Sequence, residues 1–193
     1  ALLALSVLAD SAVEHYRGSF DNPGMYAPLI TSALTLLAGT SGATGRSERR
    51  QRGARAGVYA AAAAVGAVGA GFHLYNLLRR PGGVSWLNLF YAAPIGAPAG
   101  LTLAGLLGLA SDHLEAAPSR PQPKMLGLPA GRALAALTGL GLAGTVGEAG
   151  LLHFRGAFQN PFMFAPVTIP PIASALMLKA AFAPRSRHAP WLT

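Results

Sequence analysis

The sequence predicts an all-α, polytopic integral membrane protein with six transmembrane helices arranged as three parallel-repeat helical hairpins. Three observations favour this fold. Hydrophobic residues make up 52% of the 193 residues and charged residues only 11%, whereas soluble domains carry about 25% charged residues. Six apolar stretches have roughly the length that a bilayer core requires. Two segments far apart in the chain are nearly identical, which indicates an internal repeat.

The six apolar stretches cover most of the chain. They run over residues 1–19, 24–40, 55–78, 86–111, 132–154 and 161–182. The first is the weakest, because Asp10, Glu14 and His15 interrupt it. We expect a single membrane domain over residues 1–193, with hairpins at 1–40, 55–111 and 132–182. The remaining segments are a basic cytoplasmic loop at 41–54, a cytoplasmic loop at 112–131 and a cytoplasmic tail at 183–193.

Lysine and arginine are distributed unevenly between the two predicted sides. Of the 15 basic residues, 11 lie in the loops at 40–56 and 112–132 or near the C-terminal end. The opposite side carries the other four, Arg17, Arg79, Arg80 and Arg155. The positive-inside rule therefore places both termini in the cytoplasm and three short loops outside. We expect the bacterial inner (cytoplasmic) membrane.

Several classes of protein and site are excluded or unsupported. Cysteine is absent, which excludes disulfides, thiolate metal sites and thiol nucleophiles. The first residues lack a basic segment, so we expect no signal peptide there. The net charge of +8 arises from basic loops between apolar runs, a pattern of membrane topology, and we expect no nucleic-acid partner. No phosphate-binding, zinc-protease or nucleophile-elbow motif is found.

The repeat joins the first and last hairpins. Residues 15–28 read HYRGSFDNPGMYAP and residues 153–166 read HFRGAFQNPFMFAP, with nine of the fourteen positions identical. A degenerate third copy runs from Asn88 to Pro94, and His73 lies at the matching end of the preceding helix. Each copy contains a helix, a histidine near its outer end, a short loop, an asparagine and a second helix with an Ala-Pro pair.

Local chemistry explains part of the motif. Asparagine is a good N-cap and proline suits the first turn, so Asn22 and Asn160 should begin helices. Gly18 and Gly156 are expected to end helices with a positive φ. Prolines 28, 94 and 166 should kink the second helix of each hairpin one turn in.

Small residues recur every four positions on three of the predicted helices. This pattern allows helix backbones to approach closely in lipid, and we interpret it as packing, with a flat cofactor against glycine as the alternative. The positions are Ala62, Gly66 and Ala70; Gly96, Gly100, Ala104 and Gly108; and Gly139, Ala143 and Gly147.

Ionisable residues in a membrane segment are costly and are therefore functional candidates. Asp10 and Glu148 each precede a histidine of the repeat by five residues. That offset turns a helix by about 140°, so acid and histidine face different neighbours. The candidate residues are Asp10, Glu14, His15, His73, Glu148 and His153, with Asp10, Glu14 and Glu148 in proton-transfer or supporting roles.

Several interpretations of the histidines remain open. They could bond loop carbonyls or lipid headgroups, or His15 and His153 could be axial ligands to the iron of haem b. His15, His73 and His153 could together converge on a metal ion beside Asp10 or Glu148. A quinone site or proton path is the fourth interpretation. Arg17 and Arg155 could clamp an anion such as a haem propionate, or could simply border the membrane.

These features predict a non-catalytic anchor subunit of a larger membrane complex, with electron transfer through haem b or quinone near the outer face. The loops are too short for an extramembranous catalytic domain, and the distinctive residues gather where partner subunits could dock. A small-solute or ion transporter with its path between the hairpins is the alternative. A lipid-acting enzyme at the interface is the third hypothesis.

Overall fold

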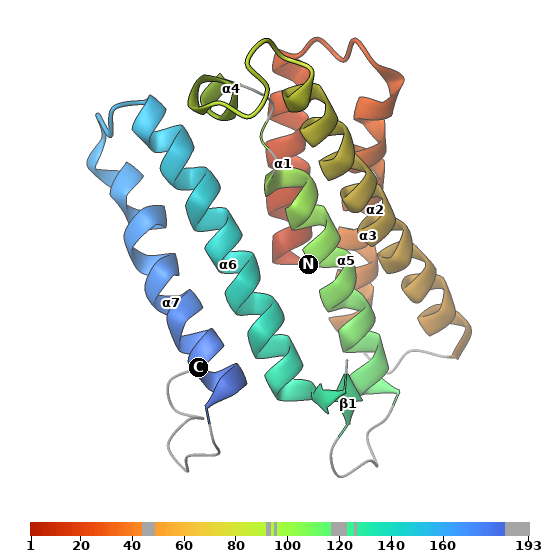
Figure 1. Ribbon diagram of the computed structural model, residues 1–193. Coiled ribbons are helices and arrows are strands. Elements are labelled where there is room, and N and C mark those ends of the chain that lie inside the picture. The colour runs from red at the N-terminus through yellow and green to blue at the C-terminus, as the bar shows by residue number, and fades with distance from the viewer. Residues whose placement is uncertain (44–48, 92–93, 95, 117–122, 126, 184–193) are drawn as a thin grey trace. The chain divides into compact units, whose positions relative to one another are not determined.

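The computed structural model describes the chain except residues 44–48, 92–93, 95, 117–122, 126 and 184–193. The described residues are mostly helical (Figure 1). The elements are α1 (Leu2–Arg17), η1 (Pro23–Met25), α2 (Tyr26–Ala43), α3 (Arg49–Leu78), α4 (Trp86–Tyr91), α5 (Gly96–Glu115), β1 (Lys124–Met125), β2 (Leu128–Pro129), α6 (Ala130–Arg155), η2 (Pro161–Phe164) and α7 (Ala165–Phe182). Strands β1 and β2 form a short antiparallel pair within the predicted 112–131 loop.

The chain divides into two compact units. Unit 1 comprises Ala1–Asn76 and Ala93–Pro118, and unit 2 comprises Leu77–Ala92 and Ser119–Thr193. Unit 1 therefore holds α1, α2, α5 and most of α3. Unit 2 holds α4, α6 and α7. The six-helix count and the single membrane domain stay predictions.

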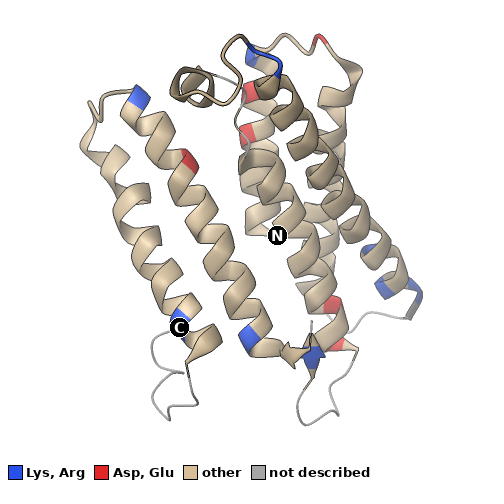
Figure 2. Cartoon of the chain, in the orientation of Figure 1, with Lys and Arg blue, Asp and Glu red and all other residues tan. Residues whose placement is uncertain are grey.

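Three described helices are long and apolar enough to cross a membrane, which supports the prediction of a membrane protein. They cover Arg50–Leu78, Ala130–Arg155 and the continuous helical run Pro161–Phe182. The first helix is shorter, with 16 residues, and rises about 24 Å. In Figure 2 the charged residues lie mainly toward the ends of the long helices, with uncharged stretches between them.

The predicted continuous span at 86–111 is wrong. The chain forms a six-residue helix, α4, and a separate helix, α5, which begins at Gly96 and continues to Glu115. Pro94 lies outside both helices, because proline lacks an N–H and its ring clashes with the preceding turn. The basic loop predicted at 41–54 is also partly helical, since α2 ends at Ala43 and α3 begins at Arg49.

Unit 1 is held by a close approach of α3 and α5. Val7, Ala62 and Leu101 form a buried cluster, with Ala62 and Leu101 fully inaccessible to solvent. A Cβ added at Gly66 would lie 2.5 Å from the Thr102 amide nitrogen, and one at Gly105 would lie 2.5 Å from the nitrogen of Ala63. Only glycine permits this approach, so the packing interpretation of the small residues is confirmed here.

Unit 2 is built around the α6–α7 hairpin. The Ser174 hydroxyl donates a buried hydrogen bond of 2.7 Å to the Gly139 carbonyl. A Cβ at Gly139 would lie 2.8 Å from the Leu178 side chain, so α6 and α7 also pack through a glycine. Gly147, from the same predicted stripe, has no heavy atom within 4 Å of an added Cβ. The small residues of α6 therefore pack against α7 at Gly139, whereas they face open space at Gly147.

The predicted asparagine caps are confirmed. Asn22 begins η1 and its side-chain oxygen accepts a 2.8 Å hydrogen bond from the Gly24 amide. Asn160 begins η2 and accepts a 2.9 Å hydrogen bond from the Phe162 amide. Each cap satisfies a backbone N–H that the first helical turn leaves without a partner.

The predicted positive φ at Gly18 and Gly156 is wrong. Their φ angles are −85° and −83°, and each glycine amide still donates to a carbonyl four residues earlier, in the last turn of its helix. The chain reverses one residue later instead, where Ser19 and Phe20 have φ of 58° and 50°. The equivalent residues 157 and 158 have φ of 55° and 48°.

Aromatic packing accompanies both reversals. Phe20 stacks on Tyr26 with ring centroids 4.7 Å apart, and Phe158 stacks on Phe164 at the same distance. A non-glycine residue at positive φ is strained, so these stacked pairs and the asparagine caps hold a conformation that the backbone disfavours.

Candidate functional site

His153 lies in the last turn of α6 and is fixed by the following loop. Its Nδ1 is 2.7 Å from the Met163 carbonyl oxygen, and its ring meets Phe158 edge-on with centroids 6.1 Å apart. A carbonyl accepts only from a protonated nitrogen, so Nδ1 carries a proton, and in the neutral tautomer Nε2 is the nitrogen with the lone pair. This is the arrangement in which a histidine can ligate a metal or accept a proton.

His15 occupies the equivalent place in α1. Its ring lies edge-on to Phe20 with centroids 6.2 Å apart. Its buried Nδ1 faces the Met25 carbonyl, but the contact falls outside hydrogen-bonding geometry, and no other described residue bonds this nitrogen. The His15 ring is therefore held less firmly than the His153 ring.

His73, near the C-terminal end of α3, also directs Nδ1 at a backbone carbonyl, that of Pro94. Asn88, which the sequence aligned with the two capping asparagines, behaves differently. It lies inside α4, is 6% exposed, and its amide nitrogen donates to the carbonyls of Pro81 at 3.0 Å and Gly83 at 2.7 Å. Asn88 therefore holds its own loop together and caps no helix.

The two arginines of the motif make different contacts. Arg17 pairs with Glu14 at 2.9 Å on an exposed surface, where an ion pair contributes little to stability. Arg155 donates to the Phe90 carbonyl at 2.8 Å and lies over the Tyr91 ring, 5.1 Å from its centroid. Arg155 thus ties α4 to the end of α6.

The acidic candidates Asp10 and Glu148 differ in exposure. Asp10 is exposed on α1 and Glu148 is half-buried in α6. Within the described part of the chain, no three histidine, aspartate or glutamate side chains are grouped as a metal ion would need. His15 and His73 belong to unit 1, and His153 belongs to unit 2.

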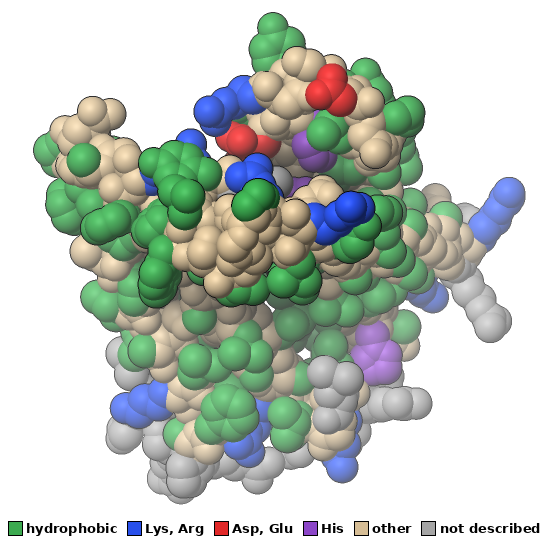
Figure 3. Space-filling view, turned by 45° about the horizontal axis from the view of Figure 1, so that its top comes forward, with side chains coloured by type: hydrophobic (Ala, Val, Ile, Leu, Met, Phe, Trp, Pro, Cys, Tyr) green, Lys and Arg blue, Asp and Glu red, His purple; other side chains and the backbone are tan. Residues whose placement is uncertain are grey.

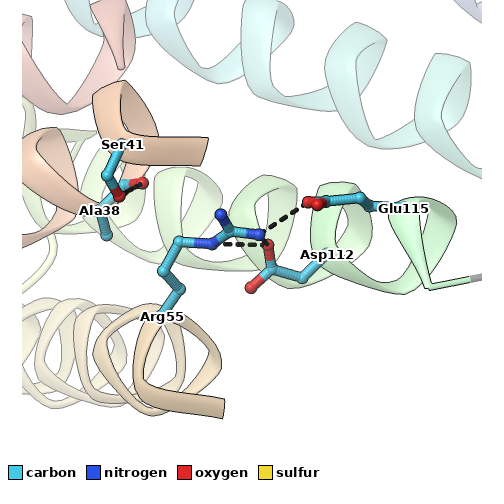
Figure 4. A network of polar contacts seen from close by, with 5 residues as sticks. All are labelled: Ala38, Ser41, Arg55, Asp112 and Glu115. Carbon is cyan, nitrogen blue, oxygen red and sulfur yellow. Dashed lines mark hydrogen bonds and ion pairs between the residues drawn. The ribbon is translucent and has the colours of Figure 1, made fainter. Parts of the chain in front are cut away.

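A second polar site in unit 1 was missed by the sequence reasoning. Arg55 of α3 donates through Nε and Nη2 to Asp112 Oδ1 of α5, at 3.1 and 2.6 Å, and through Nη2 to Glu115 at 2.7 Å (Figure 4). The side chains of Arg55 and Asp112 are 6% and 11% exposed. Ser41 of α2 lies beside this group and donates to the Ala38 carbonyl.

A signal for this site was present in the sequence. Asp112 follows Gly108 by four residues and Gly105 by seven, and therefore extends the small-residue face of α5. Arg55 precedes Tyr59 by four residues and Ala62 by seven on α3. In the sequence Arg55 lies among the basic residues of 40–56, at the start of the predicted span 55–78, and Asp112 begins the predicted loop 112–131, and neither position predicts a buried side chain.

The charged group lines a cavity of about 250 Å³ inside unit 1. Thr35, Tyr59 and Ser111 add hydroxyls to its wall. The candidates are therefore the histidines at the helix ends, each within its own unit, and the charged cavity of unit 1. Comparison with protein-family models, with curated proteins and with solved structures finds no match to this chain.

Proposed function

We propose that the chain is an integral membrane protein that anchors a larger membrane complex. The observation that carries this proposal is the uncovered apolar surface of its long helices. Only 6% of the apolar 18-residue stretch of α6 is buried within the chain, and the apolar stretch within Pro161–Phe182 has the same buried share. Large hydrophobic side chains such as Leu140, Ile169 and Ile172 are more than half exposed, and Figure 3 shows hydrophobic side chains over much of the visible face. Such a surface needs lipid or partner helices to cover it.

The proposal includes six spans in three hairpins, formed by α1 with α2, α3 with α5, and α6 with α7. The shared backbone reversal, asparagine cap and stacked aromatic pair of the first and third hairpins support a common origin. Each hairpin has two spans and returns to its starting side, so the repeats are parallel. The distribution of basic residues supports a bacterial inner membrane with both termini in the cytoplasm.

The anchoring role rests on the outer ends of the helices. Exposed aromatic side chains, including Tyr16, Trp86 and Phe162, lie at or next to these ends. Aromatic residues are typical both of the membrane–water boundary and of protein interfaces. The outer loops are short, so we propose that a partner subunit docks on them and supplies any extramembranous domain.

Electron transfer is the specific form of this role that the histidines support. His73 and His153 direct Nδ1 at a carbonyl, and no described residue bonds the Nε2 of these two side chains or of His15. We propose haem b or a quinone as the cofactor near the outer face. His15 and His153 are the candidate haem ligands, with Arg17 and Arg155 as candidate partners of its propionates.

The test is a reduced-minus-oxidised absorption spectrum of the full chain, purified in mild detergent from cells with sufficient haem. We expect a b-type α-band that is lost in His15→Ala and in His153→Ala. His113→Ala is the matched control, because His113 is exposed at the far end of α5. Folded protein without the band would rule out haem, and a band that survives both substitutions would reassign its ligands.

A transporter is the second candidate, because the cavity in unit 1 holds buried charged groups. Substrate-dependent uptake into liposomes that contain only this chain would support transport. Co-purification with a specific partner subunit, and no uptake by the isolated chain, would support the anchor.

A further inference from the structure

Three basic side chains lie at the end of the α6–α7 hairpin where α6 begins and α7 ends. Arg132 is in the first turn of α6 and Lys179 is in the last turn of α7. Lys124 belongs to β1, which pairs with the residues directly before α6. All three belong to unit 2, and Figure 2 shows basic residues at these two helix ends. We call these three residues the basic end of unit 2.

Arg132 connects the two helices. Its Nε donates a hydrogen bond to the Ala181 carbonyl in the last turn of α7, where carbonyls have no partner within the helix. No described residue bonds the terminal nitrogens Nη1 and Nη2 of Arg132. The bond to Ala181 therefore fixes the guanidinium and leaves two nitrogens that can donate to the oxygens of a phosphate.

No acidic side chain near the basic end balances its charge within unit 2. Glu148 is the only aspartate or glutamate in the sequence of unit 2. It lies 16 residues from Arg132 along α6, which is a rise of about 24 Å. Among the described residues, no ion pair involves any of the three cations. Such a concentration of positive charge attracts an anion from outside the chain.

Exposed apolar side chains adjoin the basic end of unit 2. Phe182 is 66% exposed and follows Lys179 by three residues. Ile172 is 63% exposed and precedes Lys179 by seven residues. Residues three and seven apart share a face of a helix, so one face of α7 carries a cation between two exposed hydrophobic side chains. This face is complementary to a ligand with an anionic head and apolar chains.

We propose that the basic end of unit 2 binds the phosphate of an anionic membrane phospholipid, of the class of phosphatidylglycerol. Arg132 donates to the phosphate oxygens, Lys124 and Lys179 add positive charge, and the acyl chains lie along α7 over Ile172. Basic groups at the end of a membrane helix attract anionic headgroups in this way. Binding at this surface requires the membrane location proposed above, but neither the anchor role nor a cofactor.

Other phosphate compounds fit the same surface less well. Inorganic phosphate would meet the cations but would leave Ile172 and Phe182 uncovered. A zwitterionic phospholipid would cover these side chains, but its own positive group would be repelled by the three cations. An anionic phospholipid satisfies both the charged and the apolar part of the surface.

The test is native mass spectrometry of the full chain, purified in detergent, freed of bound lipid and titrated with phosphatidylglycerol. We expect saturable binding that is about tenfold or more tighter than the binding of phosphatidylcholine, because each basic side chain favours the anionic head. An equal concentration of inorganic phosphate should not displace the lipid. Absence of saturable binding, equal affinity for the two lipids, or displacement by inorganic phosphate would overturn the proposal.

Substitutions locate the lipid. Arg132→Gln and Lys179→Gln should each weaken phosphatidylglycerol binding about fivefold, the effect of one basic side chain at a membrane surface. If Arg132→Gln does not fold, Lys179→Gln still tests the site, because Lys179 is exposed. Arg50→Gln removes the same charge from an exposed position of α3 in unit 1 and should leave the affinity unchanged. Equal loss in Arg50→Gln would show diffuse attraction to positive charge, and unchanged affinity in the folded unit 2 variants would place the lipid elsewhere. Either result refutes the assignment.

The membrane location is tested separately in the same cells. The chain should remain in the membrane fraction after a wash with alkaline carbonate. Retention without lipid selectivity would refute the phospholipid site alone. Release of the chain by carbonate would refute the membrane location and the phospholipid site with it.

Discussion

At the scale of single residues, the molecule concentrates strain and charge at a few positions. The turns that follow α1 and α6 each place two consecutive non-glycine residues at positive φ, Ser19 with Phe20 and Ala157 with Phe158. At the other end of unit 1, Arg55 and Asp112 bury opposite charges against each other. In both cases contacts with neighbouring residues offset a free-energy cost, which is backbone strain in the turns and charge burial at Arg55 and Asp112. Substitution of one residue should therefore change the stability of the protein measurably.

Ala157→Gly should stabilise the protein. The alanine has a φ of 55°, and glycine reaches this region without the steric penalty of a Cβ, which is worth up to about 1 kcal/mol. Ala149→Gly, in the interior of α6, is the control and should cost about 1 kcal/mol. Thermal unfolding in detergent measures both. A lower midpoint for Ala157→Gly would show that this turn is not strained.

Arg55→Met should destabilise the protein by about 3–5 kcal/mol, because it leaves Asp112 buried without its cation. The double variant Arg55→Met/Asp112→Leu removes both charges and should recover most of that loss. Denaturant or thermal unfolding of the single and double variants gives the comparison. Equal destabilisation in the two would mean that the stabilisation comes from side-chain packing and that the unpaired charge contributes nothing.

At the scale of elements, helix ends and helix crossings are determined by different kinds of residue. Asparagine caps begin η1 and η2 through contacts within two residues, and these starts were predicted correctly. The α3–α5 crossing depends on glycines that face the other helix's backbone. The small-residue spacing indicated close packing, but it did not identify the partner helix or show which glycines lie at the contact.

Gly105→Ala should disrupt the α3–α5 crossing. The added Cβ would lie 2.5 Å from the backbone nitrogen of Ala63, and such overpacking costs about 1–3 kcal/mol. Gly71→Ala is the matched control on α3, because an added Cβ there meets no heavy atom within 4 Å. It should be neutral or stabilising. Proteolysis in detergent or thermal unfolding would distinguish them, and equal stability of the two variants would contradict the tight crossing.

At the scale of the whole molecule, the apolar surface determines the environment. The exposed aliphatic and aromatic side chains of α6 and α7 need a nonaqueous surrounding. The uneven distribution of basic residues is the basis of the proposed direction of the hairpins. The chain has no cysteine, so single introduced cysteines can report that direction without background labelling.

In intact cells or spheroplasts, Asp21→Cys and Ser85→Cys should react with a membrane-impermeant maleimide, because they lie in the proposed outer loops. Gln51→Cys and Gly127→Cys should react only after the membrane is opened. Asp21, Ser85 and Gly127 lie between the long helices, Gln51 lies in the first turn of α3, and none of the four belongs to the charged cavity group. Labelling of Gln51→Cys from outside would reverse the orientation, and opposite accessibility of Asp21→Cys and Ser85→Cys would refute three parallel hairpins.

The amino-acid sequence by itself determined the apolar helices, the asparagine-capped starts and the likeness of the turns that follow α1 and α6. These features depend on neighbours within one or two helical turns, so a linear pattern is sufficient to predict them. It assigned the positive φ to Gly18 and Gly156, because glycine adopts that conformation most easily, and missed that stacked aromatics hold the reversal one residue later.

Only the tertiary structure decided the charged cavity. Arg55 and Asp112 are 57 residues apart, and their pairing depends on how α3 and α5 rotate and how closely Gly105 and Gly108 let them approach. Sequence spacing places each residue on a helix face, but it does not select which faces meet. Burial of a charge follows from that selection, and so the buried charged cavity emerged only when the helices were packed.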